Sequence, residues 1–206
     1  MTQDEPVRLL LAEDQAMIRE ALAALLSFEG DIEVVAQVGR GDEVLKAAEA
    51  TKPDVAVLDI EMPGMDGLAA AAELKRRSPD IKIVILTTFG RPGFLRRAME
   101  SGVSAFLVKD SPADKLTQTI RRVLAGERVI DPDLAAAALA DGVNPLTPRE
   151  RDVLEASADG RTIAEIAAQL YLSEGTVRNY LSAGIQKTGA RNRAEALRIA
   201  SERGWL

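Results

Sequence analysis

Five polar residues stand where short apolar runs of the sequence end, and their chemistry fits one shared task. Three carboxylates crowded into one site need a compensating charge, and hard oxygen ligands with open water positions suit Mg²⁺. A lysine would add a second positive charge, and a threonine would add a hydroxyl donor. A carboxylate nucleophile, a divalent metal, a lysine and a hydroxyl together describe phosphoryl transfer to a carboxylate, here Asp59. The residues are Glu13, Asp14, Asp59, Thr87 and Lys109.

That chemistry requires the apolar runs to be neighbouring strands of one sheet. The runs alternate with segments of helical spacing, which predicts an α/β fold, a parallel sheet with helices on both faces. In a flavodoxin-like strand order of 2-1-3-4-5, the first and third strands meet where the winding reverses, so Asp14 and Asp59 would share a pocket with Thr87 and Lys109 on its far side. The predicted strands cover residues 7–12, 32–38, 55–58, 81–86 and 105–108, and the predicted helices lie over 15–27 and 42–50 and after residues 67, 93 and 112.

Composition narrows the class of protein. The 206 residues are 47% hydrophobic and 28% charged, which predicts a folded protein with room for two domains. The sequence has no Cys and no His, which excludes disulfides, thiolate metal sites, histidine-dependent hydrolases and a phosphohistidine within the chain. The N-terminal residues are acidic and lack the apolar segment of a secretory signal, and no apolar run has the length of a transmembrane helix. We therefore expect a cytoplasmic protein that is not bound to a membrane.

Residues 144–206 carry a second pattern, that of a small helical domain. They hold 9 Lys and Arg against 8 Asp and Glu, whereas residues 1–143 hold 17 against 24, so the C-terminal part is less repulsive to a polyanion. Helices are predicted from Thr147, which has cap and capping-box spacing, over 162–170, from 174, and over 194–200. A helix, the turn 171–173 and a second helix form the DNA-reading unit, whose second helix enters the major groove.

Side chains of that second helix divide into two faces. Val177, Leu181 and Ile185 recur at helical spacing and would face the core. Arg and Asn suit guanine and adenine edges, so the outward residues are base-contact candidates, and further polar residues are phosphate candidates. A four-helix bundle with a solvated basic face is the alternative. The predicted DNA-binding residues are Thr176, Arg178, Asn179, Ser182, Lys187, Arg191 and Arg193.

The landmarks over residues 7–125 resemble the receiver domain of bacterial two-component response regulators, with a CheY-like fold. Asp59 lies in a Leu-Asp-Ile-Glu-Met-Pro-Gly-Met-Asp-Gly context, and the other landmarks follow in order. The resemblance implies that Asp59 accepts a phosphoryl group from a histidine of a separate sensor kinase. It also implies that Glu13, Asp14, Asp59 and the backbone carbonyl of Glu61 arrange Mg²⁺.

The same resemblance assigns roles to the remaining landmarks. Lys109 would pair with the phosphoryl oxygens, Thr87 would move toward the phosphate, and Phe106 would follow it inward. This chain departs from the common pattern at three of its positions: Glu13 stands where Asp is commoner, Phe106 where Tyr is frequent, and Asp110 follows Lys109 in place of Pro.

The Leu-Thr-Pro-Arg-Glu and Glu-Gly-Thr-Val-Arg runs of residues 144–206 resemble the LuxR-type helix-turn-helix of NarL/FixJ-family regulators. Runs at 87–94, 144–147 and 175–180 look like the subgroup that contains the desaturase regulator DesR. The predicted organisation is a receiver at 1–125, a linker at 126–143 and a DNA-binding domain at 144–206. A single module buries little DNA surface, so we expect phosphorylation to promote a homodimer on promoter DNA, with Arg96, Arg97, Met99, Lys115 and Arg122 as interface candidates.

An enzyme is the alternative function. Aspartyl-phosphate phosphatases and phosphotransferases share the nucleophile, but they usually carry a second Asp two residues later as acid and base. Glu61 holds that position here, and the Met-Pro-Gly turn after it offers no evident substrate lid. The sequence therefore favours a regulator that is not an enzyme.

Overall fold

The computed structural model describes residues 5–88, 92–132, 134–136 and 144–206. The chain divides into two compact units, Met1–Gly90 with Leu95–Ala135, and Arg91–Phe94 with Ala136–Leu206. We call them the N-terminal unit and the C-terminal unit and describe each by itself. Among the described helices, none combines the length and the hydropathy needed to cross a bilayer.

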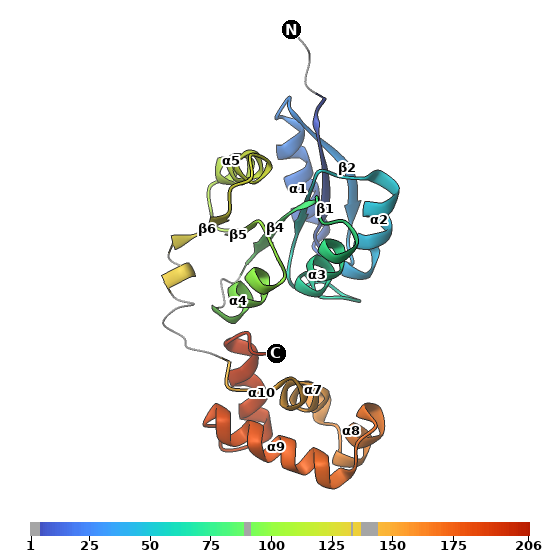
Figure 1. Ribbon diagram of the computed structural model, residues 1–206, viewed down its shortest axis with the longest axis vertical. Helices are drawn as coiled ribbons and strands as arrows, with labels where there is room; N and C mark the ends of the chain where they lie inside the picture. The colour runs from blue at the N-terminus through green and yellow to red at the C-terminus, as the bar shows by residue number, and fades with distance from the viewer. Residues whose placement is uncertain (1–4, 89–91, 133, 137–143) are drawn as a thin grey trace. The chain divides into compact units, whose positions relative to one another are not determined.

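The N-terminal unit contains a parallel sheet in the order β2-β1-β3-β4-β5-β6 (Figure 1). The order of the first five strands and the parallel pairing confirm the predicted α/β fold. Short, β-branched and aliphatic runs form the central strands because both faces of a parallel sheet are covered by helices. The strands are β1 Val7–Ala12, β2 Ile32–Val38, β3 Val55–Leu58, β4 Lys82–Thr87, β5 Ala105–Val108 and β6 Val129–Ile130.

The strand β6 corrects the five-stranded prediction. It lies in the segment predicted as a linker and pairs in parallel with β5, where Val129 N–H donates to the carbonyl of Ser104 at 3.0 Å. Gly126, at φ +91°, turns the chain back toward the sheet after the preceding helix. Two β-branched residues between turn signals are too short a pattern to distinguish from a loop, and only pairing with β5 makes them a strand.

Two helical layers cover the sheet, with α1 and α5 on one face and α2, α3 and α4 on the other (Figure 1). Alternate strand residues such as Leu9 and Leu11 form one buried cluster with residues of α1 and α5, while their neighbour Leu10 is equally buried facing away from that cluster. This alternation is the period of two of a pleated strand. The helices are α1 Ala16–Ser27, η1 Gly41–Glu43, α2 Val44–Thr51, α3 Gly67–Arg77, α4 Pro92–Glu100 and α5 Ala113–Leu124.

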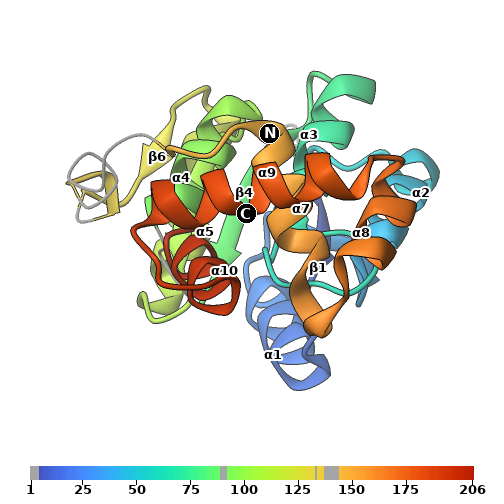
Figure 2. The same ribbon diagram turned by 90° about the horizontal axis from the view of Figure 1, so that it is seen from below.

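The C-terminal unit is helical, and its helix α9 packs against α7, α8 and α10 (Figure 2). Side-chain caps start all four of these helices: Thr147 and Thr162 each form a capping box, and Ser173 and Asn192 each accept a backbone N–H. The predicted cap and capping box at Thr147 are thus confirmed. The elements are α7 Pro148–Ala156, η2 Ala158–Gly160, α8 Ile163–Leu170, α9 Glu174–Thr188 and α10 Arg193–Glu202.

A tight turn joins α8 to α9. Tyr171 ends α8 in the left-handed conformation, at φ 54°, and the following Leu172 N–H donates to the carbonyl of Ala167 at 2.9 Å. Ser173 then caps α9 by accepting the N–H of Thr176 at 3.1 Å. Helix, three-residue turn and helix therefore follow one another as the sequence predicts.

Candidate functional site

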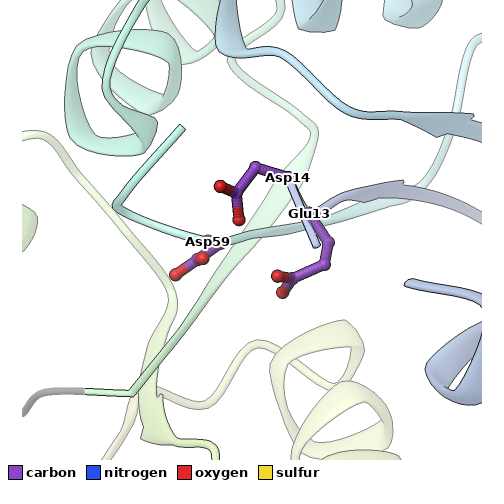
Figure 3. A group of neighbouring side chains, drawn as sticks. All are labelled: Glu13, Asp14 and Asp59. Atoms are coloured by element: carbon purple, nitrogen blue, oxygen red, sulfur yellow. The ribbon is translucent and has the colours of Figure 1, made fainter. Parts of the chain in front are cut away.

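The carboxyl edge of the sheet brings the predicted phosphoryl-transfer residues together. Ala12 pairs with Leu58, and the ladder continues past the strand ends, where Asp59 N–H donates to the carbonyl of Ala12 at 2.9 Å. Glu13 and Asp59 are therefore the next residues on adjacent strands, and Figure 3 shows their side chains near that of Asp14. On the other side of β3, Lys109 N–H donates to the carbonyl of Thr87 at 2.8 Å, so the amine reaches the same edge.

Lys109 joins two buried carboxylates. Its Nζ lies 2.6 Å from Oε2 of Glu13 and 2.9 Å from Oδ2 of Asp59, and the Glu13 and Asp59 side chains are 1% and 4% exposed. Burial lowers the pKa of Lys109, but its hydrogen bonds to both carboxylates outweigh this and raise the pKa above its usual value. Burial raises the pKa of Glu13, against the opposing hydrogen bond from Lys109. Two carboxylates thus share one ammonium group, so a further cation in this cluster would be favoured by the negative charge that Lys109 leaves uncompensated.

Asp14 completes a possible metal site. One carboxylate oxygen from each of Glu13, Asp14 and Asp59 can be chosen so that all three lie within 4.8 Å of one another. Asp14 is exposed while the other two are buried, so the cluster opens to solvent on the Asp14 side. Three hard oxygen donors with room for water fit Mg²⁺ in type and in charge.

The remaining predicted residues of this site lie at different depths. Thr87 is 1% exposed at the end of β4, and Phe106 is 1% exposed on β5. Ile85 pairs with Phe106 and stands two residues before Thr87, so Thr87 and Phe106 project from the same face of the sheet. Glu61 is exposed in the turn after β3, and its carboxylate is not part of the three-carboxylate cluster.

One link near this site has no counterpart in the sequence prediction. Asp66 Oδ1 caps α3 by accepting the N–H of Ala69 at 2.6 Å, while its Oδ2 lies 3.1 Å from Nη2 of Arg97 on α4. One carboxylate therefore ties the loop after β3 to α4. The Asp66-Gly67 pair signals a helix cap, but nothing local in the sequence indicates Arg97, which is 31 residues away.

Replacing Lys109 with Met is expected to destabilise the N-terminal unit in a pH-dependent way. Loss of the amine leaves two adjacent buried carboxylates, which costs about 3 kcal/mol at about pH 8. Because the pKa of Glu13 is already above its ordinary 4.5 and rises further without Lys109, stability falls as the pH rises through that raised pKa, and the loss is smaller at about pH 5. Urea unfolding followed by circular dichroism in EDTA measures this.

Arg40→Met is the control, because it removes an exposed cation whose partner Asp42 is also exposed. It should leave stability nearly unchanged at both pH values. If Lys109→Met lowered the free energy of unfolding equally at the two pH values, the raised pKa assigned to Glu13 would be contradicted.

The candidate DNA-reading surface is the outer face of α9. Val177 and Leu181 are buried in the core of the C-terminal unit, while Arg178, Asn179 and Ser182 are exposed. This is the division that the helical spacing predicts. Arg178 already has a neighbour, since its Nη2 lies 2.7 Å from Oε2 of Glu174 one turn earlier, but both side chains are at least half exposed. Such a pair is weak and leaves Arg178 able to exchange partners.

The predicted phosphate-contact residues differ in their surroundings. Thr176 shares a hydrogen bond of 2.8 Å with the hydroxyl of Ser173. Arg191 is 86% exposed and pairs with Glu195. Arg193 donates from Nη1 to the carbonyl of Arg161 at 2.7 Å. Lys187 is bound to the buried Glu150, a connection considered below.

Gly184→Ala is expected to stabilise the C-terminal unit by about 1 kcal/mol, because Gly is the poorest helix former after Pro. Gly184 lies inside α9, and an added methyl would meet Cδ2 of Leu146 at 3.9 Å, an ordinary contact. Thermal unfolding followed by the fluorescence of Trp205 measures the change. Trp205 is the one tryptophan of the chain, and it is buried in the core of this unit.

Gly189→Ala provides the matched control on the same helix. Gly189 ends α9 at φ +69°, a left-handed conformation that a Cβ disfavours although the surrounding space is open. This variant should lower the unfolding temperature. Two shifts of the same sign would contradict the assigned backbone roles.

Comparison with known proteins agrees with the description of both the sheet-containing unit and the helical unit. Residues 9–121 match the response regulator receiver domain, and residues 144–200 match the bacterial regulatory proteins of the luxR family. The chain is 46% identical over 200 residues to the uncharacterized transcriptional regulatory protein YvfU of Bacillus subtilis, covering 97% of this chain and 100% of YvfU. It is 45% identical to the transcriptional regulatory protein DesR of the same organism, covering 97% of this chain and 99% of DesR.

Solved structures share the fold. The response regulator ChrA of a heme-sensing two-component system aligns with a TM-score of 0.58 at 29% identity, over 98% of this chain and 100% of ChrA. A structure of two RcsB dimers bound to two parallel DNAs aligns with a TM-score of 0.66 at 20% identity, over 96% of this chain and 99% of RcsB. The protein belongs to the DNA-binding response regulators of the NarL/FixJ type, which join a receiver domain to a LuxR-type helix-turn-helix.

Proposed function

We propose that Asp59 is the phosphoacceptor of this regulator and that its phosphorylation by a sensor histidine kinase switches binding of promoter DNA. The observation that carries the proposal is the buried Asp59 carboxylate, bonded to Lys109 at the sheet edge beside two further carboxylates. Residues 1–125 would supply the phosphoacceptor function, residues 144–206 would read DNA, and residues 126–143 would connect them, with β6 extending the sheet into the first part of that connection.

In the proposed reaction a carboxylate oxygen of Asp59 attacks the phosphorus of a phosphohistidine. The P–O bond forms as the P–N bond breaks, and the imidazole leaves with its electron pair and takes up a proton. Lys109 neutralises charge on the phosphoryl oxygens, and the buried Thr87 hydroxyl donates to one of them. Glu13, Asp14, Asp59 and the backbone carbonyl of Glu61 would hold Mg²⁺, which supplies charge neutralisation when bound.

The proposed consequence is a change on the face of the sheet that carries Thr87 and Phe106. Both side chains are buried on that face, so a movement of Thr87 toward the phosphate would open space that Phe106 fills. Phosphorylation would then favour a homodimer, which doubles the DNA contact of a small helix-turn-helix and presents two copies of α9 to successive major grooves. The proposed contacts to bases come from Arg178, Asn179 and Ser182, and those to phosphates from Thr176, Arg191 and Arg193.

The regulator proposal is favoured over an aspartyl-phosphate enzyme by Glu61. An enzyme of that kind needs an acid and base beside the nucleophile, and the Glu61 side chain is exposed and outside the carboxylate cluster. Turnover of a small phosphomonoester by the purified protein would favour the enzyme instead.

The proposed switch is tested by DNA binding with and without acetyl phosphate and Mg²⁺. The wild type should bind fragments of its own genome more tightly, and sediment as a dimer, after phosphorylation. Asp59→Ala should bind equally with and without the phosphodonor. Equal affinity of the wild type for DNA in both conditions would show that phosphorylation does not switch DNA binding.

A further inference from the structure

Lys187, one of the residues with the spacing of a phosphate contact, is bound to a carboxylate inside the protein. Its Nζ lies 2.7 Å from Oε2 of Glu150, and the Lys187 and Glu150 side chains are 36% and 7% exposed. Lys187 is in the last turn of α9, and Glu150 is in the first turn of α7. The two residues are 37 positions apart in the sequence, so the bond is a tertiary link between the two helices.

Glu150 has a second fixed partner. Its Oε2 also accepts the N–H of Thr147 at 2.7 Å, and its own N–H donates to Oγ1 of Thr147 at 3.3 Å. Burial would raise the pKa of Glu150, but hydrogen bonds from Lys187 and from Thr147 outweigh it and hold the pKa below its usual value. Glu150 is therefore an ionised, buried carboxylate, and removal of Lys187 would leave that charge without its counter-ion.

The segment that holds Glu150 is itself rigidly fixed to the unit. Asn144 accepts the N–H of Leu146 at 2.9 Å and donates from Nδ2 to the carbonyl of Trp205 at 2.8 Å. Val153 of α7 and Val177 of α9 are buried in the same apolar cluster, and such burial stabilises the helix pair without a directional bond. The ion pair between Lys187 and Glu150 adds a directional bond at the C-terminal end of α9.

We infer that Lys187 is a positioning residue for DNA reading: by binding Glu150 it holds α9 at the angle that presents Arg178 and Asn179 to the bases. Lys187 stands nine residues after Arg178 in α9, a separation of roughly 13 Å along the helix axis. A small rotation at the Lys187 end therefore displaces the base-reading end, where hydrogen bonds to base edges tolerate little error. This inference rests on the proposed role of α9 in DNA reading.

The test compares specific and non-specific binding by the full-length phosphorylated protein over a series of salt concentrations. The specific probe is a duplex selected from random DNA by the wild type, and the non-specific probe is a random-sequence duplex. Lys187→Met and Glu150→Gln are each expected to weaken binding to the selected duplex about tenfold, with a much smaller effect on the random duplex. The double variant should be no weaker than either single variant, because the two residues act as one link.

A phosphate contact would give a different result. Lys187→Met would then weaken binding to both duplexes alike and lower the slope of log affinity against log salt by about one, while Glu150→Gln would have no effect. That outcome, or unchanged binding in every variant, overturns the inference. Lys187→Arg, whose guanidinium also reaches a carboxylate, should restore most of the specificity.

Two controls separate this result from other failures. Fluorescence of Trp205 establishes that each variant is folded at the temperature of measurement, so an unfolded fraction does not mimic lost affinity. Arg178→Ala tests the DNA-reading role of α9 without touching Lys187. Unchanged binding by Arg178→Ala would count against the proposed reading surface itself, whereas loss in Arg178→Ala with none in Lys187→Met rejects only the positioning role.

Discussion

Asp59→Asn is expected to abolish phosphorylation of the protein by acetyl phosphate in the presence of Mg²⁺. The amide has nearly the shape of the carboxylate, so Lys109 keeps its contact with Glu13 and the fold is retained. The amide is not a nucleophile, however, so the variant has no group at this position that could attack the phosphodonor. Intact-mass measurement after incubation should show one added phosphoryl group on the wild type and none on the variant.

Asp54→Asn is the matched control for that substitution, at the opposite end of the same strand. Asp54 is exposed just before β3, where its Oδ2 accepts the N–H of Arg8 at 2.9 Å. This variant should be phosphorylated like the wild type. Asp14→Asn should also keep the acceptor but need more Mg²⁺, because Asp14 is the exposed donor of the three-carboxylate cluster. Full phosphorylation of Asp59→Asn would disprove the assignment of the acceptor.

The parts of the molecule that follow from the sequence are those with a local cause. Buried runs such as Val55–Leu58 signal strands, and polar residues directly after them must meet at one edge of a parallel sheet. The capping pattern from Thr147 to Glu150 likewise indicates where a helix starts. These signals predict the first five strands, and with a flavodoxin-like strand order they also predict that Asp59 and Lys109 share one edge of the sheet; they likewise predict the helix-turn-helix.

The parts that could not be predicted depend on approaches between distant residues. The capping pattern identifies Glu150 as a cap partner, but its burial and its bond to Lys187 arise only when α7 packs on α9. Similarly, the sequence predicts Lys109 on the far side of the pocket that holds Asp59, whereas its Nζ lies 2.6 Å from Oε2 of Glu13 and 2.9 Å from Oδ2 of Asp59. The short strand β6 has the same explanation, since pairing with β5 defines it.

For Lys109 and Lys187, the exposure and the partner of the side chain indicate its role better than the residue type does. Each amine is held by a buried glutamate, and each such bond fixes the end of one element against another. The difference is that Lys109 also contacts the carboxylate proposed to react, whereas the ion pair of Lys187 within the described part of the chain is with Glu150. A basic residue whose position in the sequence predicts a contact with a ligand can therefore have another role, in which it binds a carboxylate of the same protein and positions a neighbouring element.

The second large effect is expected at Arg178 and Asn179, the exposed base-contact candidates of α9. Replacement of either by Ala should weaken binding to the selected duplex by about 1–3 kcal/mol, the discrimination of one bidentate side chain–base pair. The preference for one base pair should relax in each variant, because only the contact with that base is lost. Binding of the phosphorylated protein to duplexes that differ by single base changes measures both effects.

Two further substitutions test whether the change in base preference is specific to the exposed side chains of α9. Arg149→Ala removes an exposed arginine from α7, where it pairs with Asp152 at 3.4 Å, and should leave the base preference unchanged. Glu174→Gln removes the carboxylate that holds Arg178, so Arg178 no longer has to leave a partner before it binds a base, and affinity for the selected duplex should rise. An unchanged base preference in both Arg178→Ala and Asn179→Ala would show that α9 does not read sequence, since a helix in the major groove discriminates bases only through the side chains that it directs at them.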